Sequence, residues 1–388
     1  MKKGFKYDLI IIGGGISACV FASKYLQNNI TKKIALIEIG RGLGGRSSTR
    51  ISKRFKGWRL NHGAPNLNIC NSKNDFLLKS YIDELLENKL IKIDDSEIVS
   101  LDEEANLETM INSEFNCGIK YHSLFSMSQL SENIIELNNL RGNIDFYFET
   151  LIVDLEFDND EWTLTSKDGD KFKCINLVCS TNLLLHKRSL KILKVDQIPL
   201  RKAIPKNKDK KIDLLLNFLD KQSFIPRLTF LIYTNENYGY KDFYSQKYRY
   251  FYLNKRLENK YKFERVIFQL QDHNKLGIVV HTKNIDFINS YINAEDDDFF
   301  KQKIFTNFNQ LFSNNSLVNQ LTCNEDISIM KWRASQPSGC AVPLSLQFIR
   351  KYRIGFCGDW FEGEGFGRIE GSILSALILE EKFKKSFK

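Results

Sequence analysis

Long apolar runs are absent from this sequence of 388 residues. No stretch approaches the roughly 18–20 apolar residues that a membrane-spanning helix requires. The short apolar run at residues 9–12 is also shorter than the core of a secretory signal peptide, and it leads into Gly13, Gly14 and Gly15 instead of a small-residue cleavage site. We therefore expect a cytoplasmic protein without a membrane span.

Closely spaced cysteine pairs are missing as well. None of the eight cysteines belongs to a C-x-x-C pair, so the spacing indicates neither a zinc site nor a dithiol redox centre, and no metal site is predicted. Most lie in apolar contexts, and we interpret these as reduced thiols of the core. The cysteines are Cys19, Cys70, Cys117, Cys174, Cys179, Cys323, Cys340 and Cys357.

The basic residues form no concentrated tract, although 56 Lys and Arg outnumber 47 Asp and Glu and give a net charge of +9. A lysine-rich solvated surface explains this charge better than a nucleic-acid site, so no nucleic-acid partner is expected. A hydrophobic content of 43% excludes a largely disordered chain. The length exceeds that of one compact core, which predicts two packed domains.

The apolar pattern near the start predicts a parallel βαβ unit. Residues 7–12 and 33–37 are typical of strands buried on both faces, and residues 17–26 between them are typical of a helix. Further helices are predicted over 76–89, 126–137, 296–312 and 369–383. An alternating stretch at 144–157, followed by 162–166 and 171–179, predicts a β-meander that returns to the parallel sheet. Residues 200–330 alternate aromatic-rich strands with polar loops, which favours an antiparallel sheet with covering helices.

The glycine motif G-x-G-x-x-A joins the first strand to the first helix. Gly13 permits the tight turn, Gly15 lets the backbone approach a pyrophosphate, and Ala18 lets the helix pack closely on the strand. The start of the helix, at Ile16 and Ser17, offers free N–H groups to phosphate. Glu38 ends the second strand, where an acid accepts the ribose hydroxyls of a dinucleotide and disfavours a 2′-phosphate.

A second glycine-rich loop, RGLGGRSSTR, runs from Arg41 to Arg50 directly after this acid. Gly44 and Gly45 permit close passage of the backbone past a diphosphate, and Arg46 can neutralise its charge. With Glu38, this loop resembles the double-glycine motif of the monoamine-oxidase-type flavoproteins. The extended loop and LNHGA, residues 60–64, resemble the renalase-like branch of that superfamily. MSQL at 127–130, KWRASQP at 331–337 and GFCGDWFEGEGFGRIEGSILSA at 355–376 resemble further segments of these proteins.

The resemblance implies non-covalent FAD and an α/β fold: a Rossmann-type FAD-binding domain with a second α+β substrate domain built on an antiparallel sheet. The FAD-binding domain would comprise 1–75, 126–190 and 331–388, and the substrate domain 76–125 and 191–330. The implied cofactor-binding residues are Gly13, Gly15, Ile16, Ser17, Ala18, Glu38, Arg41, Gly44, Gly45, Arg46, His62, Gly63, Ala64, Ile152, Gly358, Asp359, Arg368 and Ile369. The helix that begins at Arg368 and Ile369 would place its positive end at the flavin pyrimidine, where reduced flavin carries negative charge.

Two residues leave alternatives open. His62 is the histidine best placed to act near the flavin ring, but a structural role within its own loop fits equally well, and Asn61 stands where relatives commonly have Asp. Cys340 loosely resembles the segment at which some amine oxidases attach flavin covalently, but the renalase-like pattern does not require that thiol.

The activity that the resemblance implies is hydride transfer from a small reduced substrate to FAD, with O2 or another acceptor reoxidising the flavin. Renalase-like relatives oxidise isomers of NAD(P)H, so a dihydronicotinamide nucleotide is the specific expectation. A flavin amine oxidase or polyene desaturase is one alternative, and a non-enzymatic flavin-binding protein is another. An aromatic cage or apolar tunnel would favour the first alternative, whereas a polar, basic pocket would favour the dihydronicotinamide.

Overall fold

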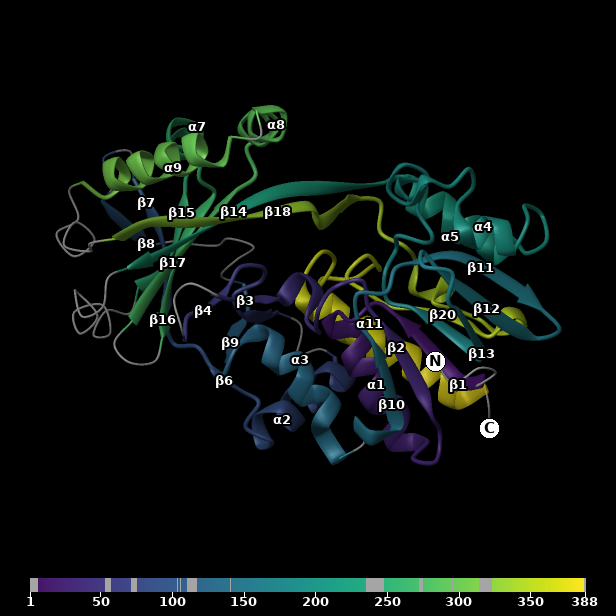
Figure 1. Ribbon diagram of the computed structural model, residues 1–388. Helices are drawn as coiled ribbons and strands as arrows, with labels where there is room; N and C mark the ends of the chain where they lie inside the picture. The colour runs from purple at the N-terminus through teal and green to yellow at the C-terminus, as the bar shows by residue number, and fades with distance from the viewer. Residues whose placement is uncertain are drawn as a thin grey trace.

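The structure is a computed structural model. It describes residues 6–52, 57–70, 75–102, 104, 106–109, 117–139, 141–234, 248–271, 275–294, 296–313 and 323–386. Two lobes are built on two large sheets (Figure 1). The long strands β14 (Gln222–Thr234) and β18 (Cys323–Gly339) pair antiparallel and run from one lobe to the other.

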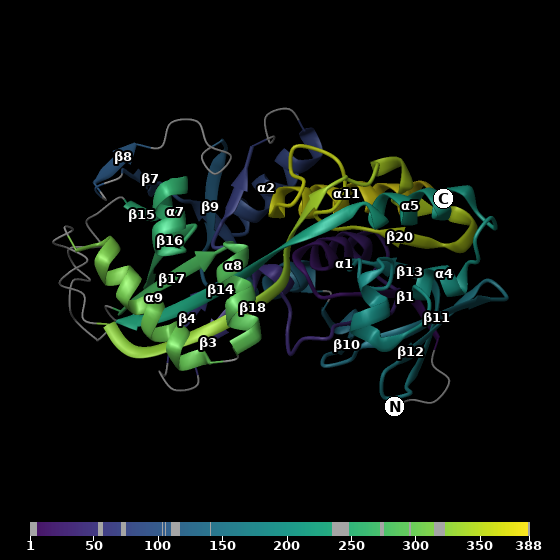
Figure 2. The ribbon, with the colours of Figure 1, turned by 90° about the horizontal axis from the view of Figure 1, so that it is seen from above.

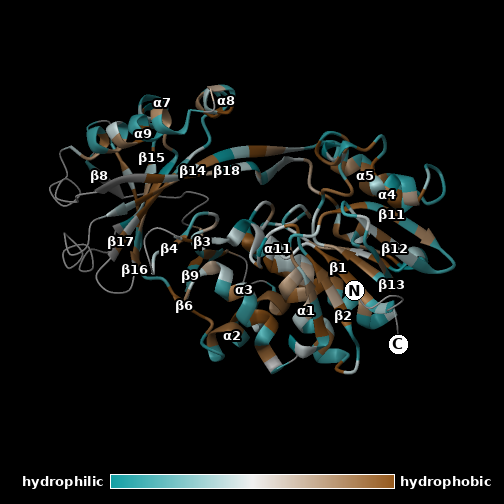
Figure 3. Ribbon diagram, in the orientation of Figure 1, coloured by the Kyte–Doolittle hydropathy of each residue, from teal (hydrophilic) through white to brown (hydrophobic). Residues whose placement is uncertain are grey.

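The first lobe contains a mainly parallel sheet. Strands β10 (Ile144–Tyr147), β2 (Ile34–Ile37), β1 (Lys6–Ile12), β13 (Lys171–Cys179) and β20 (Ile354–Phe356) pair parallel in that order. Strands β11 (Ile152–Asp158), β12 (Glu161–Ser166) and the first half of β13 form an antiparallel meander, and β19 (Phe348–Ile349) pairs with β20. Figure 3 shows the apolar character of β1, which is covered on both faces as parallel strands require.

Helices cover one face of this sheet. Helix α1 (Ile16–Asn28) packs against α11 (Ile369–Ser386), with α2 (Phe76–Glu87) and α3 (Met127–Glu136) beside them in one apolar core. The small side chains of Ala18 and Ala22 are fully buried there, which permits close packing of the helix. On the other face, α4 (Pro199–Ala203) and α5 (Lys210–Asp220) share a second core with the meander.

The second lobe is an antiparallel sheet covered on one side. Its strand order is β18-β14-β17-β16-β15-β7-β8, and only β15 and β7 pair parallel. The bounds are β17 (Lys275–Thr282), β16 (Arg265–Gln271), β15 (Tyr248–Leu253), β7 (Glu97–Leu101) and β8 (Leu107–Thr109). Helices α7 (Lys255–Tyr261), α8 (Ile285–Ala294) and α9 (Asp297–Leu311) lie on one side of the sheet (Figure 2). Alternate residues of the strands pack against these helices, so the remaining residues face the first lobe.

Two small sheets complete the fold, and the three-stranded one packs into the core of the first lobe through Leu67, Ile69, Ile91 and Tyr121. Strand β3 (Thr49–Ile51) pairs with β4 (Arg59–Asn61), and β9 (Ile119–Ser123) pairs with both β5 (Leu67–Ile69) and β6 (Ile91–Ile93). Asn61 and the Gln269 side chain exchange two hydrogen bonds of 2.8 and 2.9 Å, which attach β4 to the antiparallel sheet.

The predicted fold class is confirmed, but several details differ, among them the unpredicted strands β3 to β9. The alternating stretch at 144–157 is two strands: β10 pairs parallel with β2, and only β11 enters the meander. Helices α4 and α5 were not predicted, and they pack on the parallel sheet although they follow residue 190. The division into domains stays a prediction.

Candidate functional site

A cavity of about 690 Å³ lies between the carboxyl ends of the parallel strands and the open face of the antiparallel sheet. The glycine turn follows β1, Glu38 follows β2, Ser180 follows β13 and Asp359 follows β20, and all of them line this cavity. Ligands of open α/β sheets bind at this edge, where the strand order reverses. The fold therefore defines a nucleotide-sized site whose far wall belongs to the second sheet.

The first helix presents an uncapped N-terminus to the cavity. Gly15 is its N-cap, no side chain caps it, and its first turn contains no acidic residue. Ile16 and Ser17 of that turn line the cavity. The free N–H groups and positive end of the helix dipole can therefore bind a phosphate.

The double-glycine loop lies directly on this turn. Gly44 donates its N–H to Gly14 O at 2.8 Å, and Gly45 has a φ of +53°. A Cβ at Gly45 would lie 3.1 Å from the Cα of Gly15, so a side chain there would push the two loops apart. The approach of Gly63 is closer still, because a Cβ there would lie 2.0 Å from Arg46 O.

The Glu38 carboxylate accepts hydrogen bonds from the backbone of two loops. Its carboxylate accepts the Gly14 N–H at 2.5 Å and the Gly40 N–H at 2.6 Å. The acid thus holds the glycine turn in place while it lines the cavity at the end of β2. These contacts use charge-assisted hydrogen bonds, which are stronger than neutral ones.

Arg46 and Asp359, which are far apart in sequence, form a bidentate ion pair in the cavity wall. The two guanidinium nitrogens donate to the two carboxylate oxygens at 2.7 and 2.6 Å. The pair joins the double-glycine loop to the loop after β20. Arg46 remains partly exposed, whereas Asp359 is buried, so the arginine retains a solvent-facing side.

His62 is a buried, neutral histidine in this wall. Burial, with a smaller contribution from the charge of Arg50, lowers its pKa to about 4. Its Nε2 lies 3.1 Å from Ser48 Oγ, and its ring stacks on Trp332 with a centroid distance of 5.0 Å. Its Nδ1 has no hydrogen-bond partner among the described residues.

A row of polar side chains crosses the far wall. Thr229, His281, Arg265 and Tyr252 are register partners on β14, β17, β16 and β15, so they point to the same face. All four line the cavity. Arg265 donates from Nε to His281 Nδ1 at 3.0 Å and from its guanidinium to Tyr252 Oη at 3.1 Å.

The hydrogen bond from Arg265 determines the tautomer of His281. Burial first, and then the charges of Arg265 and Arg227, lower the pKa of His281 well below its usual value, so the ring is neutral. Because Nδ1 accepts, Nε2 carries the proton. His281 Nε2 and the Thr229 hydroxyl are both buried without a partner among the described residues. Buried polar atoms in a cavity wall require a water or a ligand.

Positive charge exceeds negative charge in this part of the cavity wall and directly behind it, where Glu264 and Lys283 lie outside the lining. Glu264 is buried and accepts two hydrogen bonds from Arg227 and a third from Lys283, each of 2.9–3.0 Å. Although its burial opposes ionisation, the charges of Arg265 and Arg227 hold its pKa well below the usual range. One carboxylate thus faces three cations here.

Arg188 adds a further cation from the first lobe. Burial and the nearby charge of Arg46 lower its pKa to about 10. Its guanidinium lies 3.9 Å from the ring centroid of Phe224, and one terminal nitrogen donates to Asn182 Oδ1 at 2.9 Å. Its buried Nε has no partner among the described residues.

Most of the residues predicted to bind a cofactor line this one cavity. They are Gly13, Gly15, Ile16, Ser17, Glu38, Gly44, Gly45, Arg46, His62, Gly63, Ala64, Asp359, Arg368 and Ile369. Ala18 is buried under the turn and Ile152 is buried in β11. Arg41 is exposed outside the lining, and Gly358 donates its N–H to Ser375 Oγ instead of facing the cavity. Cys340 is not among the residues that line it.

Sequence reasoning missed the polar residues of the far wall and Arg188. The available signal was a polar residue within an otherwise apolar strand, as in Thr229 between Leu228 and Phe230 and His281 after Val279 and Val280. Such a residue is buried, and it therefore requires a partner.

The cysteine interpretation needs a correction. Cys70 and Cys117 form a disulfide with a Cα–Cα distance of 5.7 Å, although 47 residues separate them in sequence. The search for closely spaced cysteines could not find this disulfide. The two cysteines come together only because β5 pairs with β9. Cys19, Cys174, Cys179 and Cys357 are buried free thiols, as expected. The described residues contain no group of three or more potential ligands that could hold a metal ion.

Comparisons with known proteins agree with this architecture. Residues 11–85 match the family of NAD(P)-binding Rossmann-like domains. The chain resembles the structure of cyclohexylamine oxidase from Brevibacterium oxydans IH-35A at 10% identity, with a TM-score of 0.68 over 99% of this chain and 100% of that one. It also resembles wild-type putrescine oxidase bound to putrescine, at 10% identity, with a TM-score of 0.64 over 98% of this chain and 99% of that one. No curated protein matches the sequence.

The fold is therefore the two-lobed, Rossmann-containing α/β fold of these oxidases. At such low identity the likeness concerns the fold alone. Across the described residues, the longest apolar helices fall short of what crossing a membrane would take.

Proposed function

We propose that this protein is an FAD-dependent oxidoreductase that takes a hydride from a small reduced substrate, specifically a dihydronicotinamide nucleotide of the NAD(P)H-isomer class. The observation that carries the substrate assignment is the basic, donor-rich far wall formed by Thr229, His281 and Arg265, together with Arg188 of the first lobe in the same lining. O2 or another acceptor would reoxidise the flavin.

The residues of the cavity fit FAD held without a covalent bond. The uncapped N-terminus of α1 would hold the pyrophosphate, Glu38 the ribose, and the start of α11 at Ile369 the pyrimidine end. The supporting observation is the cradle itself, where Gly45 and Gly63 leave no room for a Cβ. When bound, FAD supplies the acceptor atom for a hydride. The chain supplies orientation and exclusion of water.

The protein's own groups favour an acceptor-rich, anionic substrate. His281 Nε2 can donate to a carbonyl oxygen, and the Thr229 hydroxyl can either donate or accept. A carboxamide presents a carbonyl oxygen and an NH2 group side by side, which this pair can satisfy together. Arg188 and Arg265 would attract the phosphates of a nucleotide. His62 is neutral at physiological pH. It holds its neighbours Ser48 and Trp332 in place at the cavity wall and is not required to exchange a proton.

An amine oxidase is the second candidate. Its support is the fold of putrescine and cyclohexylamine oxidases, together with the aromatic side chains of Tyr250, Tyr252 and Trp332 in the lining. An alkylammonium ion would, however, approach the cations Arg188 and Arg265, and this repulsion weakens the candidate.

Anaerobic stopped-flow mixing tests the two candidates. The purified protein is mixed with 2- and 6-dihydronicotinamide isomers, ordinary NADH, putrescine and cyclohexylamine while flavin absorbance is followed. We expect fast bleaching by a dihydronicotinamide isomer and little by the amines, because the donor carbon must lie about 3–3.5 Å from the flavin with its hydride aimed at it. Fast bleaching by an amine with inert dihydronicotinamides would replace this proposal with the second candidate, and bleaching by none of the donors would favour a non-enzymatic flavoprotein.

Release of the flavin tests the mode of binding. Acid precipitation of the yellow protein should leave intact FAD in the supernatant. Colour retained in the pellet would contradict non-covalent binding and direct attention to Cys340.

A further inference from the structure

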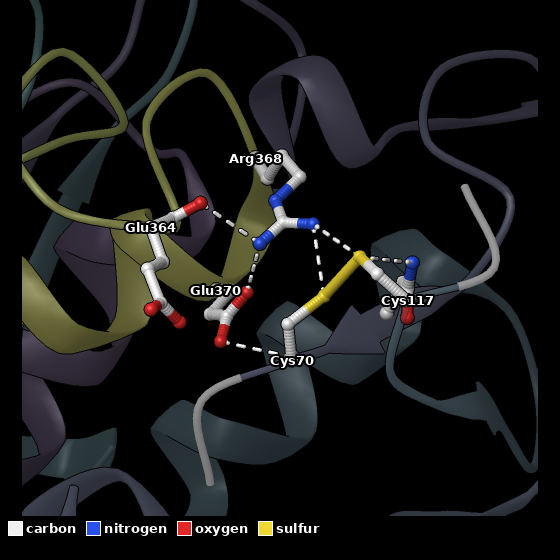
Figure 4. Close-up of a disulfide and its surroundings, with 6 residues drawn as sticks. Cys70, Cys117, Glu364, Arg368 and Glu370 are labelled. Atoms are coloured by element: carbon white, nitrogen blue, oxygen red, sulfur yellow. Dashed lines mark hydrogen bonds and ion pairs between the residues drawn. A yellow bond between two sulfur atoms is a disulfide. The ribbon is translucent and has the colours of Figure 1, made fainter. Parts of the chain in front are cut away.

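The Cys70–Cys117 disulfide lies against an arginine of the cavity wall (Figure 4). Arg368 directs one terminal nitrogen at both sulphur atoms, 3.1 Å from Cys70 Sγ and 3.3 Å from Cys117 Sγ. Its other terminal nitrogen donates to Glu370 Oε2 at 2.5 Å and to Glu364 O at 2.9 Å. Arg368 also lines the cavity and immediately precedes α11.

A buried carboxylate completes the contact. Glu370 is 1% exposed, and its Oε1 accepts the Cys70 N–H at 3.0 Å while Oε2 accepts from Arg368. Glu370 thus connects the backbone of one cysteine to the arginine that contacts both sulphurs. A negative charge on either sulphur would therefore attract the guanidinium that contacts both of them.

The pair is accessible, unlike most other cysteines of the chain. Cys117 is exposed and Cys70 is half-buried, whereas Cys19, Cys174, Cys179 and Cys357 are buried. The two half-cystines are brought together by the register of β5 and β9, in which Ile69 pairs with Ile119. Because β5 and β9 are also joined as paired strands, we expect the two sulphurs to stay adjacent after reduction.

We propose that Cys70 and Cys117 form a reversible thiol–disulfide exchange site, whose redox state sets the position of Arg368 and of the start of α11 at the cavity. The external reactant is a low-molecular-weight thiol. Its thiolate attacks Cys117 Sγ, a mixed disulfide forms, and the electron pair of the broken bond stays on Cys70 Sγ as a thiolate beside Arg368. A second external thiolate attacks the external sulphur of the mixed disulfide and releases the Cys117 thiolate.

The reaction balances as a two-electron exchange. Two external thiols are oxidised to one external disulfide, the protein disulfide is reduced to two thiols, and the protons move from the former to the latter through solvent. The adjacent guanidinium stabilises the thiolate that leaves. A thiolate then competes with Glu370 and Glu364 O for Arg368, whereas the neutral disulfide does not.

Differential alkylation tests the site in the folded protein. The protein is incubated with or without dithiothreitol, treated with iodoacetamide, and analysed by peptide mass spectrometry, with half-buried Cys340 as the internal control. We expect Cys70 and Cys117 to be labelled only after dithiothreitol treatment and to become protected again after reoxidation. The four buried cysteines should stay unlabelled. Labelling of the pair in the air-oxidised protein, or resistance of the bond to dithiothreitol, would overturn the proposal.

Amide hydrogen exchange tests the coupling without any ligand. Reduction of the wild type should speed amide hydrogen exchange over residues 369–373. The C70S/C117S variant should exchange at one rate with or without dithiothreitol. The control variant C340S should behave as the wild type. Unchanged exchange in the reduced wild type would refute the coupling. The link to cofactor affinity rests on the proposed function: there we expect reduction to weaken FAD binding about fivefold, at the low end of coupling between two sites. If FAD does not bind at all, the alkylation and exchange results still decide this proposal.

Discussion

His62 illustrates how a single residue in this wall couples ionisation to stability. Its folded-state pKa of about 4 lies below the usual 6.5 because of burial, so the unfolded chain takes up a proton more readily between these values. The contribution of His62 to stability is therefore fully present above pH 6.5 and is lost as the pH falls towards 4. Lowering the pKa from 6.5 to about 4 corresponds to on the order of 3 kcal/mol.

We therefore expect the His62→Gln variant to lose stability less steeply with acidification than the wild type. Chemical denaturation at several pH values between 4 and 7 measures the two slopes. Burial also lowers the pKa of His122, a partly buried histidine outside the cavity lining, so His122→Gln should flatten the slope in the same direction and serves as the comparison variant. Parallel slopes for the wild type and His62→Gln would show that His62 titrates normally.

Glu38 carries a second prediction at this scale. Glu38→Ala removes a ribose acceptor and also the carboxylate that binds the Gly14 and Gly40 N–H groups. Loss of such a charge-assisted interaction costs about 1.5–3 kcal/mol, or about 10- to 150-fold in FAD affinity. Flavin fluorescence titration measures it, with Glu156→Ala, an exposed site on β11, as the charge-matched control. Hydride transfer in the residual holoenzyme should change less, and unchanged affinity would mean that the ribose acid has been misassigned.

At the scale of elements, the double-glycine loop depends on its contact with the glycine turn. Gly45→Ala places a methyl group 3.1 Å from the Cα of Gly15 at a φ of +53°, a backbone region that costs non-glycine residues about 1–2 kcal/mol. We expect a loss of stability of that size and weaker FAD binding. Gly42→Ala, where nothing lies within 4 Å of the added Cβ, should leave both within error. Equal behaviour of the two variants in thermal unfolding and titration would contradict the close approach.

The elements near the glycine turn could be predicted because their signals are local. The strand of β1, the turn and α1 follow one another within one short segment, and the period of the apolar residues changes at the glycines. The split of residues 144–157 could not be predicted, because pairing of β10 with β2 is a contact between segments more than 100 residues apart. Helices α4 and α5 were not predicted for a different reason: α4 has only five residues, and the aromatic-rich pattern that follows α5 favours strands over that region.

At the scale of the whole molecule, the cavity exists only because two sheets face each other. Arg46 meets Asp359 across 313 residues, and His281 acquires its tautomer from Arg265 on the neighbouring strand. The local sequence around each of these residues gives no sign of its role, because the role arises from strand register and from the packing of the two lobes. The glycine motifs indicated the nucleotide end of the cavity, whereas the substrate end became visible only in three dimensions.

Arg188 provides the prediction that depends on both lobes. Its Nε has no partner among the described residues, and it lies near Arg46, so an anionic group of the substrate would relieve the repulsion between these two cations. Arg188→Met removes the charge, and with it the cation–π contact with Phe224, but retains a long apolar side chain at this position. We expect the variant to bind a dihydronicotinamide nucleotide, which carries phosphate, about tenfold more weakly than the wild type. This loss corresponds to about 1.4 kcal/mol for a hydrogen bond to a charged group.

The phosphate-free donor 1-methyl-dihydronicotinamide should bind the Arg188→Met variant and the wild type equally, because it has no group for the guanidinium to contact. Lys187→Met, at the neighbouring exposed lysine that pairs with Asp220 on the surface, is the charge-matched control and should change neither donor. The dissociation constants follow from the concentration dependence of anaerobic flavin bleaching, measured at two salt concentrations because screening weakens charge contacts. An equal loss for both donors would mean that Arg188 shapes the cavity instead of recognising an anion, and no loss for either would remove it from the substrate site.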